Sequence, residues 1–315
     1  MVFNDLPFEK PINELKKKIN DIRTGSEKGS EAKISRLEKK LKKLIDKTYK
    51  KLGAWDIVQL ARHPQRPHTM DYISGMASDF IELHGGRFFG DDKAMVGGFL
   101  TIGPHRVVFI GHERGSDTDD KLYRNFGMAH PEGYRKALRL MKLAEKFNLP
   151  VVTFIDTPGA YPGIGAEERG QAEAIAKNLR EMANLTTPTI SVVIGEGGSG
   201  GALGIGVTDR ILMFQYSIYS VISPEGCASI LFRDAKKAED SAKALKLTSS
   251  DLLEEGIIDR VIEEPQGGAH TNPNLMYSII KSVLIEELDS IKKMKTGVLI
   301  RKRLSKYKNM GVYGK

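Results

Sequence analysis

Two short apolar runs, each followed at once by a glycine-rich turn and then by a helical segment, constrain the fold of this chain more than any other feature. Residues 151–155 precede the turn at 156–163, and residues 189–194 precede the turn at 195–202. Uninterrupted apolar runs of this length are typical of strands that are buried on both faces of a sheet. We therefore expect an α/β domain with largely parallel strand pairing.

The segments around these runs support the same architecture. A further apolar run at 107–110 predicts another buried strand. Amphipathic periodicity predicts helices over 132–148, 166–185 and 275–295. We assign residues 53–290 to this main domain.

The amino-terminal segment has a different composition and periodicity. Residues 11–52 are rich in Lys and Glu, and their apolar residues recur at helical spacing in two runs that are separated by turn-forming residues at 24–30. This pattern predicts an antiparallel helical hairpin over residues 1–52, which we interpret as an assembly element because its narrow apolar stripe is regular in both arms. Residues 291–315 form a basic carboxyl-terminal tail that we expect to be partly ordered at best.

The net charge of +8 is unevenly distributed along the chain. Residues 1–51 hold 15 basic and 8 acidic residues, and residues 281–315 hold 10 and 3, so each end carries +7 while the middle carries −6. The glycine-rich region is thus mildly acidic, which disfavours nucleic-acid binding there. Cys227 is the one cysteine, so the chain forms no internal disulfide and no cysteine-based zinc site of its own. The absence of a long apolar stretch or signal-peptide pattern predicts a cytoplasmic protein without a membrane span.

The glycine-rich turns are the strongest candidates for a functional site. Glycine allows another backbone or a ligand to approach closely. A helix that begins in such a turn leaves its first N–H groups unpaired, and they point at the space above the strand end. Two such turns on successive strands outline an oxyanion hole, in which preorganised amides stabilise a developing negative charge.

The second turn is compatible with other interpretations. Its Gly-x-Gly-x-x-Gly pattern has the dinucleotide-binding form, but no acidic residue lies about 20 positions on. Its Gly-x-Ser-x-Gly pattern has the nucleophile-elbow form, which would make Ser199 the nucleophile of a serine hydrolase with His270 as the one histidine that follows it. A third interpretation is a scaffold without catalytic activity, and the intact glycine motifs speak against it. His130 is best explained as the start of a helix with Pro131 at its first position.

Five stretches of sequence, in order, closely resemble the alpha subunit of bacterial-type acetyl-CoA carboxylase carboxyltransferases. They are residues 124–141, 154–163, 167–179, 195–206 and 220–228. The resemblance extends over most of the chain and is weakest after about residue 288. It implies a crotonase-like (ClpP/crotonase) fold, a spiral of strand-strand-helix units.

This resemblance also implies a function that requires a second polypeptide. Members of the family form an α2β2 heterotetramer with a beta subunit, which carries a four-cysteine zinc site, so no metal is expected in this chain. They transfer a carboxyl group from carboxybiotin, held on a separate biotin carboxyl carrier protein, to acetyl-CoA, and the malonyl-CoA produced enters fatty-acid biosynthesis. ATP is used only by the biotin carboxylase component of the larger complex.

Carried over position by position, the resemblance assigns roles to backbone groups of the two turns. The amides of Gly201 and Ala202 would form the oxyanion hole for the ureido oxygen of biotin. The remaining carboxybiotin-binding positions would shape the second turn or line the opposite wall: Gly198, Ser199 and Gly200, and Gly159 and Ala160.

Overall fold

The fold is organised around one mixed sheet of eight strands. The computed structural model describes residues 6–24, 30–77 and 79–311. Seven strands follow one another in the order β1-β2-β3-β4-β5-β6-β8, and β7 pairs with β5. The strands are β1 Phe80–Glu82, β2 Met95–Ile102, β3 His105–His112, β4 Val151–Thr157, β5 Thr189–Gly198, β6 Arg210–Phe214, β7 Ile218–Ser220 and β8 Arg260–Ile262.

Strand pairing in this sheet changes from antiparallel at one edge to parallel through the centre. The β1–β2 and β2–β3 pairs are antiparallel, whereas the β3–β4, β4–β5, β5–β6 and β6–β8 pairs are parallel. The strands expected at 107–110, 151–155 and 189–194 are present as β3, β4 and β5, and the expected parallel pairing is confirmed. Their near-complete burial explains the uninterrupted apolar runs.

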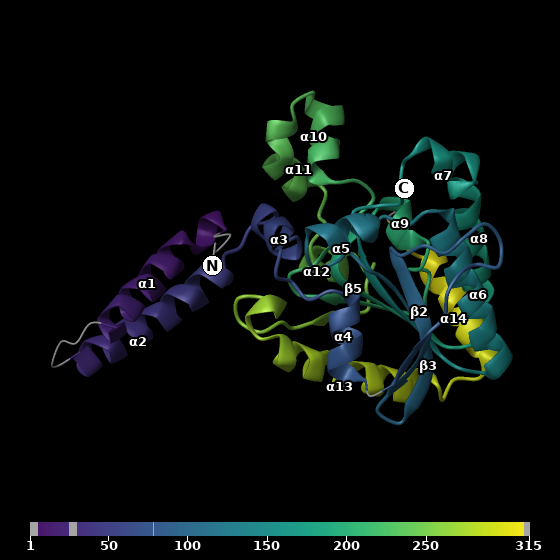
Figure 1. Ribbon diagram of the computed structural model, residues 1–315, viewed down its shortest axis with the longest axis horizontal. Coiled ribbons are helices and arrows are strands. Elements are labelled where there is room, and N and C mark those ends of the chain that lie inside the picture. The colour runs from purple at the N-terminus through teal and green to yellow at the C-terminus, as the bar shows by residue number, and fades with distance from the viewer. Residues whose placement is uncertain (1–5, 25–29, 78, 312–315) are drawn as a thin grey trace.

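Helices cover both faces of the sheet (Figure 1). Alternate strand residues point to opposite faces, so Phe154 and Val192 join a core with α4 and α13, while Ile155 and Val193 join a second core with α6 and α8. The helices are α1 Lys10–Thr24, α2 Ser30–Tyr49, α3 Ala54–Ala61, α4 Thr69–Met76, α5 Thr118–Tyr123, α6 Pro131–Phe147, α7 Ile164–Glu168, α8 Gln171–Asn184, α9 Ser199–Leu203, α10 Pro224–Phe232, α11 Ala238–Ala244, α12 Ser249–Glu254, α13 Pro273–Ile291 and α14 Thr296–Lys308.

Two sequence-based expectations about helices are wrong. The helix expected over 166–185 is broken into α7 and α8 at Gly170, whose φ of 81° takes the backbone out of the helical region. The carboxyl-terminal tail, expected to be partly ordered at best, forms α14 and packs on the body. Its Arg303 is only 1% exposed and binds the Asp209 carboxylate and the carbonyl groups of three other residues.

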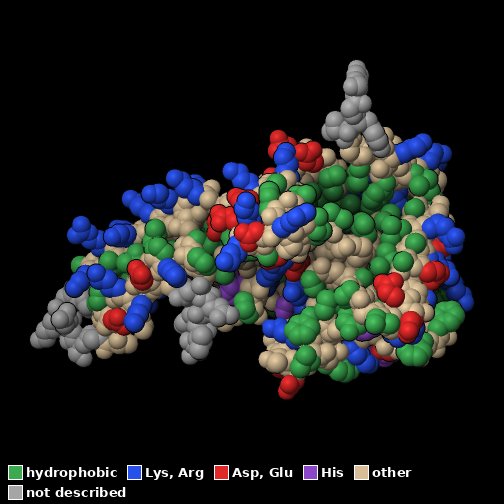
Figure 2. All heavy atoms as spheres, turned by 90° about the horizontal axis from the view of Figure 1, so that it is seen from above, with side chains coloured by type: hydrophobic (Ala, Val, Ile, Leu, Met, Phe, Trp, Pro, Cys, Tyr) green, Lys and Arg blue, Asp and Glu red, His purple; other side chains and the backbone are tan. Residues whose placement is uncertain are grey.

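The amino-terminal hairpin projects from the body, as Figure 1 shows. Helices α1 and α2 pack against each other, and Ile12 and Ile19 of α1 are buried. The predicted turn at 24–30 falls largely on residues 25–29, which lie outside the described residues. Lys and Arg side chains line the outer surface of the hairpin (Figure 2), so the excess of basic residues at this end of the chain is exposed to solvent.

A second projection lies near the carboxyl ends of the central strands. After β7 the chain leaves the sheet and forms α10 and α11, which stand off the body in Figure 1. Helix α11 packs on α3, and α10 packs on α11. We refer to residues 224–244 as the α10–α11 arm.

Candidate functional site

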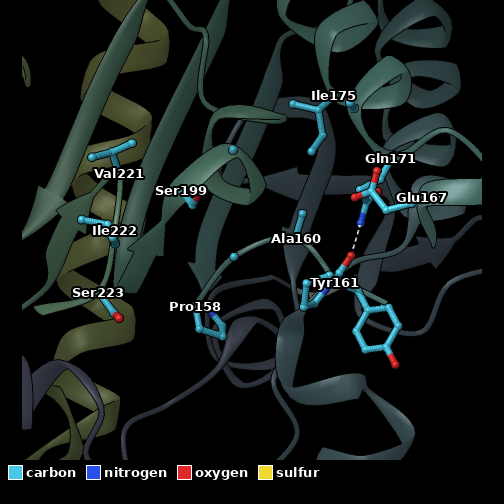
Figure 3. Close-up of a pocket in the computed structure, with 14 residues that line it drawn as sticks. Pro158, Ala160, Tyr161, Glu167, Gln171, Ile175, Ser199, Val221, Ile222 and Ser223 are labelled. Atoms are coloured by element: carbon cyan, nitrogen blue, oxygen red, sulfur yellow. Dashed lines mark hydrogen bonds between the residues drawn. The ribbon is translucent and has the colours of Figure 1, made fainter. Parts of the chain in front are cut away.

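The two glycine-rich turns lie side by side at the carboxyl ends of β4 and β5. The strands are paired up to Thr157 and Gly197, with a local shift in register just before these residues. Beside the turns is a cavity of about 440 Å³, with residues of α8 on one side and the segment that leads into α10 on the other (Figure 3). Its lining is Pro158, Gly159, Ala160, Tyr161, Pro162, Glu167, Gln171, Ala172, Ile175, Ser199, Gly200, Val221, Ile222 and Ser223.

The second turn packs backbone to backbone against the first. An ideal Cβ at Gly198 would lie 2.1 Å from the carbonyl oxygen of Pro158. An ideal Cβ at Gly201 would lie 2.5 Å from the amide nitrogen of Ala160. Real Cβ atoms do not approach other atoms this closely, so glycine is required at both positions by the neighbouring chain.

A buried carboxylate ties the two turns together. Asp156, which ends the apolar run of β4, accepts a hydrogen bond from the Glu196 amide at 3.1 Å. Burial alone would raise the pKa of Asp156, but Arg114 and the hydrogen bond with His68 lower this pKa to about 2. An ideal Cβ at Gly195 would lie 2.5 Å from the same carboxylate oxygen. Asp156 is therefore ionised at neutral pH and fixes the position of β5 relative to β4.

Helix α9 begins in the second turn with unpaired amides. No side chain caps this helix. Within the described residues, the amides of Ser199 to Ala202 donate no hydrogen bond to a backbone carbonyl of another segment. Ser199 and Gly200 line the cavity, as do Gly159 and Ala160. Gly201 and Ala202 are buried directly behind this lining.

The wall opposite the second turn is held by hydrogen bonds from α8. Gln171 donates from its side-chain amide to the carbonyl groups of Ala129 and Tyr161, at 2.9 and 3.0 Å. The ring of Tyr161 lies 4.4 Å from that of His130, centroid to centroid. His130 precedes α6 and Pro131 is the first residue of the helix, so the interpretation of this segment as a helix start is confirmed.

The surroundings of Ser199 do not resemble those of a hydrolase nucleophile. The cavity lining includes no histidine. The ring of His270 instead stacks on that of His63, with centroids 3.8 Å apart, and burial lowers the pKa of His270 to about 3. His270, the one histidine that follows Ser199 in the sequence, therefore packs against His63 and does not line the cavity beside Ser199.

Comparison with known proteins agrees with this geometry. Residues 5–311 match the family described as acetyl co-enzyme A carboxylase carboxyltransferase-like. The chain belongs to this family. A protein of Xanthomonas campestris pv. campestris (strain B100) named acetyl-coenzyme A carboxylase carboxyl transferase subunit alpha is 56% identical over 313 residues, which cover 98% of each chain. A protein of the same name from Chlorobaculum parvum is 55% identical, over 98% of this chain and 97% of that protein.

Solved structures show that this chain shares its fold with a transcarboxylase and with a malonate decarboxylase subunit. Transcarboxylase 12S has a TM-score of 0.59 and 18% identity, and the match covers 74% of this chain and 44% of that one. A subunit of a Pseudomonas malonate decarboxylase hetero-tetramer in complex with coenzyme A has a TM-score of 0.60 and 15% identity, covering 75% and 91%. The expected crotonase-like fold is confirmed, and the serine hydrolase alternative receives no support from any of these relatives.

The sequence analysis missed a network of charged side chains that lies beneath the two glycine turns of this chain. Arg114 lies within 3.4 Å of Asp156 and 3.2 Å of Glu196, and Arg62 lies 2.6 Å from Glu196. The available signal was a carboxylate within two residues of the end of each of the two buried apolar runs, Asp156 and Glu196, since a buried charge requires a partner. Within the described residues there is no group of three or more side chains suited to hold a metal ion, and no helix is both long and apolar enough to cross a membrane.

Proposed function

We propose that this chain supplies the carboxybiotin side of a carboxyltransferase site that is completed by a beta subunit. The reaction is transfer of the carboxyl group from carboxybiotin, delivered on a biotin carboxyl carrier protein, to acetyl-CoA to give malonyl-CoA. Family membership supplies the reaction class. The observation that carries the site assignment is the row of unpaired amides at the start of α9, at the edge of the cavity beside the two turns.

The backbone of the second turn performs the main chemical task in this proposal. Negative charge develops on the ureido oxygen as the carboxyl group leaves, and the amides of Gly201 and Ala202 stabilise it. Gly198, Ser199 and Gly200 shape the turn that aims these amides, while Gly159 and Ala160 of the first turn line the same cavity. Because the two turns pack backbone to backbone, the donors are preorganised and need no rearrangement during the reaction.

This chain does not need to supply a side-chain base. The donor brings its own, since the ureido nitrogen that is freed of the carboxyl group takes up the proton from the acetyl group. Among the described residues that line the cavity, Tyr161 and Glu167 have ionisable side chains. Glu167 is exposed to solvent. The task left to this chain is to bind, orient and stabilise.

The proposal implies partners and a compartment. We infer an α2β2 assembly with the beta subunit, which would hold the zinc ion and complete the acyl-CoA pocket. The carrier protein and the ATP-using biotin carboxylase would complete the larger complex. A single, buried Cys227 is compatible with the reducing cytoplasm.

Reconstitution with a beta subunit tests the function. The purified chain alone is expected to be inactive, and mixing it with the beta chain is expected to give carboxyl transfer between malonyl-CoA and a biotin acceptor. Converting the Gly201 amide to an ester, by incorporation of glycolate at this position, removes one donor without adding a side chain. Transfer should then fall on the order of 100-fold, as for loss of one oxyanion donor. Transfer at a near wild-type rate would overturn the site assignment, whereas fluorophosphonate labelling of Ser199 without any partner would overturn the reaction class.

A further inference from the structure

Arg62, directly after α3, binds carboxylates on two other elements. Its Nη2 lies 2.6 Å from Oε1 of Glu196, to which its Nε also donates at 3.0 Å. Its Nη1 lies 2.7 Å from Oε1 of Glu225. Glu196 lies in β5 and belongs to the second glycine turn, and Glu225 is in the first turn of α10. One guanidinium therefore connects the turn to the base of the α10–α11 arm.

The segment between these two anchors forms one wall of the cavity. Strand β7 pairs with β5 as far as Ser220, opposite Gly198, and residues 221–223 then line the cavity before α10 begins. This wall is fixed at one end by sheet pairing. At its other end it joins α10, whose first turn is bound by Arg62.

The two halves of the Arg62 fork differ in solvent exposure. The side chain of Glu196 is 6% exposed, whereas that of Glu225 is 40% exposed. Buried charge-assisted hydrogen bonds are stronger than exposed ones. The ion pair between Arg62 and Glu225 therefore breaks more easily than the one between Arg62 and Glu196. Arg114 also binds Glu196, at 3.2 Å, so loss of Arg62 does not leave the buried Glu196 carboxylate without a cation.

We propose that Arg62 is a positioning residue for the donor cavity, holding the wall at residues 221–223 against the second glycine turn by joining Glu225 to Glu196. The identification of carboxybiotin as the ligand of this cavity rests on the proposed function. The link that Arg62 makes between Glu225 and Glu196 does not depend on it. When the fork is broken, the base of the arm moves away from the turn and the cavity loses its defined width. The consequence for catalysis is weaker donor binding, with a smaller effect on the chemical step.

The chain contains a reporter of this link. Cys227, the one cysteine in the sequence, lies in α10 two residues after Glu225 and is 7% exposed. Arg62→Lys keeps the charge but removes the planar fork that binds two carboxylates at once. In the isolated chain, we expect a thiol reagent to modify Cys227 at least about fivefold faster in this variant, because modification follows local opening. Arg260→Lys is the matched control, since Arg260 also binds two carboxylates, those of Glu286 and Glu287, outside the cavity.

Assays with the beta subunit complete the test. Arg62→Lys should raise the KM for the biotin substrate several-fold and change kcat by less than about twofold, and Arg260→Lys should change neither. Glu225→Gln leaves the bond between Arg62 and Glu196 in place, so it keeps the test valid if Arg62→Lys fails to fold. Unchanged Cys227 modification in both fork variants would overturn the link. Faster modification with an unchanged KM would overturn its role in positioning the wall, and an inactive wild-type mixture would count against the proposed function instead.

Discussion

Two glycines of the second turn, Gly198 and Gly201, are required by the backbone of a neighbouring segment, whereas the glycines of the first turn are not. A methyl group at Gly198 or Gly201 would meet main-chain atoms of the first turn at 2.1 and 2.5 Å. At Gly159 the nearest atom outside its own neighbours is the Cβ of Ser199 at 3.9 Å, and at Gly163 a methyl would meet only the ring of Tyr161. The second turn is thus built onto the first, which serves as its support.

This difference shows what the two similar motifs contribute. Close approach of two backbones leaves no room for adjustment, because neither can rotate aside as a side chain can. The second turn, which leads into α9, is therefore the rigid part of the site. The first turn contributes its Pro158 carbonyl and the amide of Ala160 as packing surfaces, and its side chains have more freedom to vary.

The largest expected effect comes from Gly198→Ala. The added methyl would lie 2.1 Å from the Pro158 carbonyl oxygen, so both turns must shift apart. We expect the free energy of unfolding to fall by on the order of 3 kcal/mol, as in overpacked cores, as measured by urea denaturation. Gly200→Ala is the control: its methyl would meet only Ile175 at 3.8 Å, and stability should change by less than about 0.5 kcal/mol. Equal losses in both variants would refute the contrast between packed and open positions.

A second effect concerns acid stability at the place where the turns meet. His112 is fully buried, and burial lowers its pKa to about 4, although the nearby Asp156 carboxylate and the backbone of Gly201 and Phe154 favour the protonated form. The unfolded chain, with a pKa of about 6.5, then binds a proton that the folded chain excludes. Stability should therefore decrease as the pH falls from about 6.5 to 4, by roughly 3 kcal/mol for this group.

His112→Gln removes this titration and provides the test. Unfolding free energies of the wild type and the variant, measured between pH 7 and pH 4.5, should converge as the pH falls. Parallel curves for wild type and His112→Gln would show that His112 is not kept neutral by its surroundings.

Local patterns in the sequence identified the parts of the fold that depend on local physics. Uninterrupted apolar runs identified β3, β4 and β5, and the glycines after β4 and β5 located the turns that adjoin the cavity. The break at Gly170 was missed because periodicity continues through it, and only its positive φ separates α7 from α8. The order of the carboxyl-terminal tail was missed because a basic segment resembles a solvated one until Arg303 is seen to bind Asp209.

The candidate site was predictable only at the level of the backbone. Glycine spacing indicated where donors would lie, but not that Gly198 contacts Pro158, because that contact joins positions 40 residues apart through the register of two strands. The sequence indicated that Glu196 needs a cationic partner, but not that Arg62 and Arg114 are the partners. Charged residues on three elements carry no shared sequence signal until the fold brings them together.

The smallest expected effect concerns Ser199, a residue of the second turn that has a positive φ without being glycine. Ser199 has a φ of 54°, in the left-handed region that favours glycine and costs other residues about 1 kcal/mol. Ser199→Gly should therefore raise the free energy of unfolding by up to about 1 kcal/mol, less the entropy that glycine gains in the unfolded chain. Asn148→Gly is the matched control, since Asn148 has a φ of 53° but asparagine tolerates a positive φ. The increase in the free energy of unfolding should be smaller for Asn148→Gly than for Ser199→Gly. A loss of stability in Ser199→Gly would mean that the hydroxyl group holds the turn in place, and the rigidity of the second turn would then depend on a side chain as well as on backbone packing.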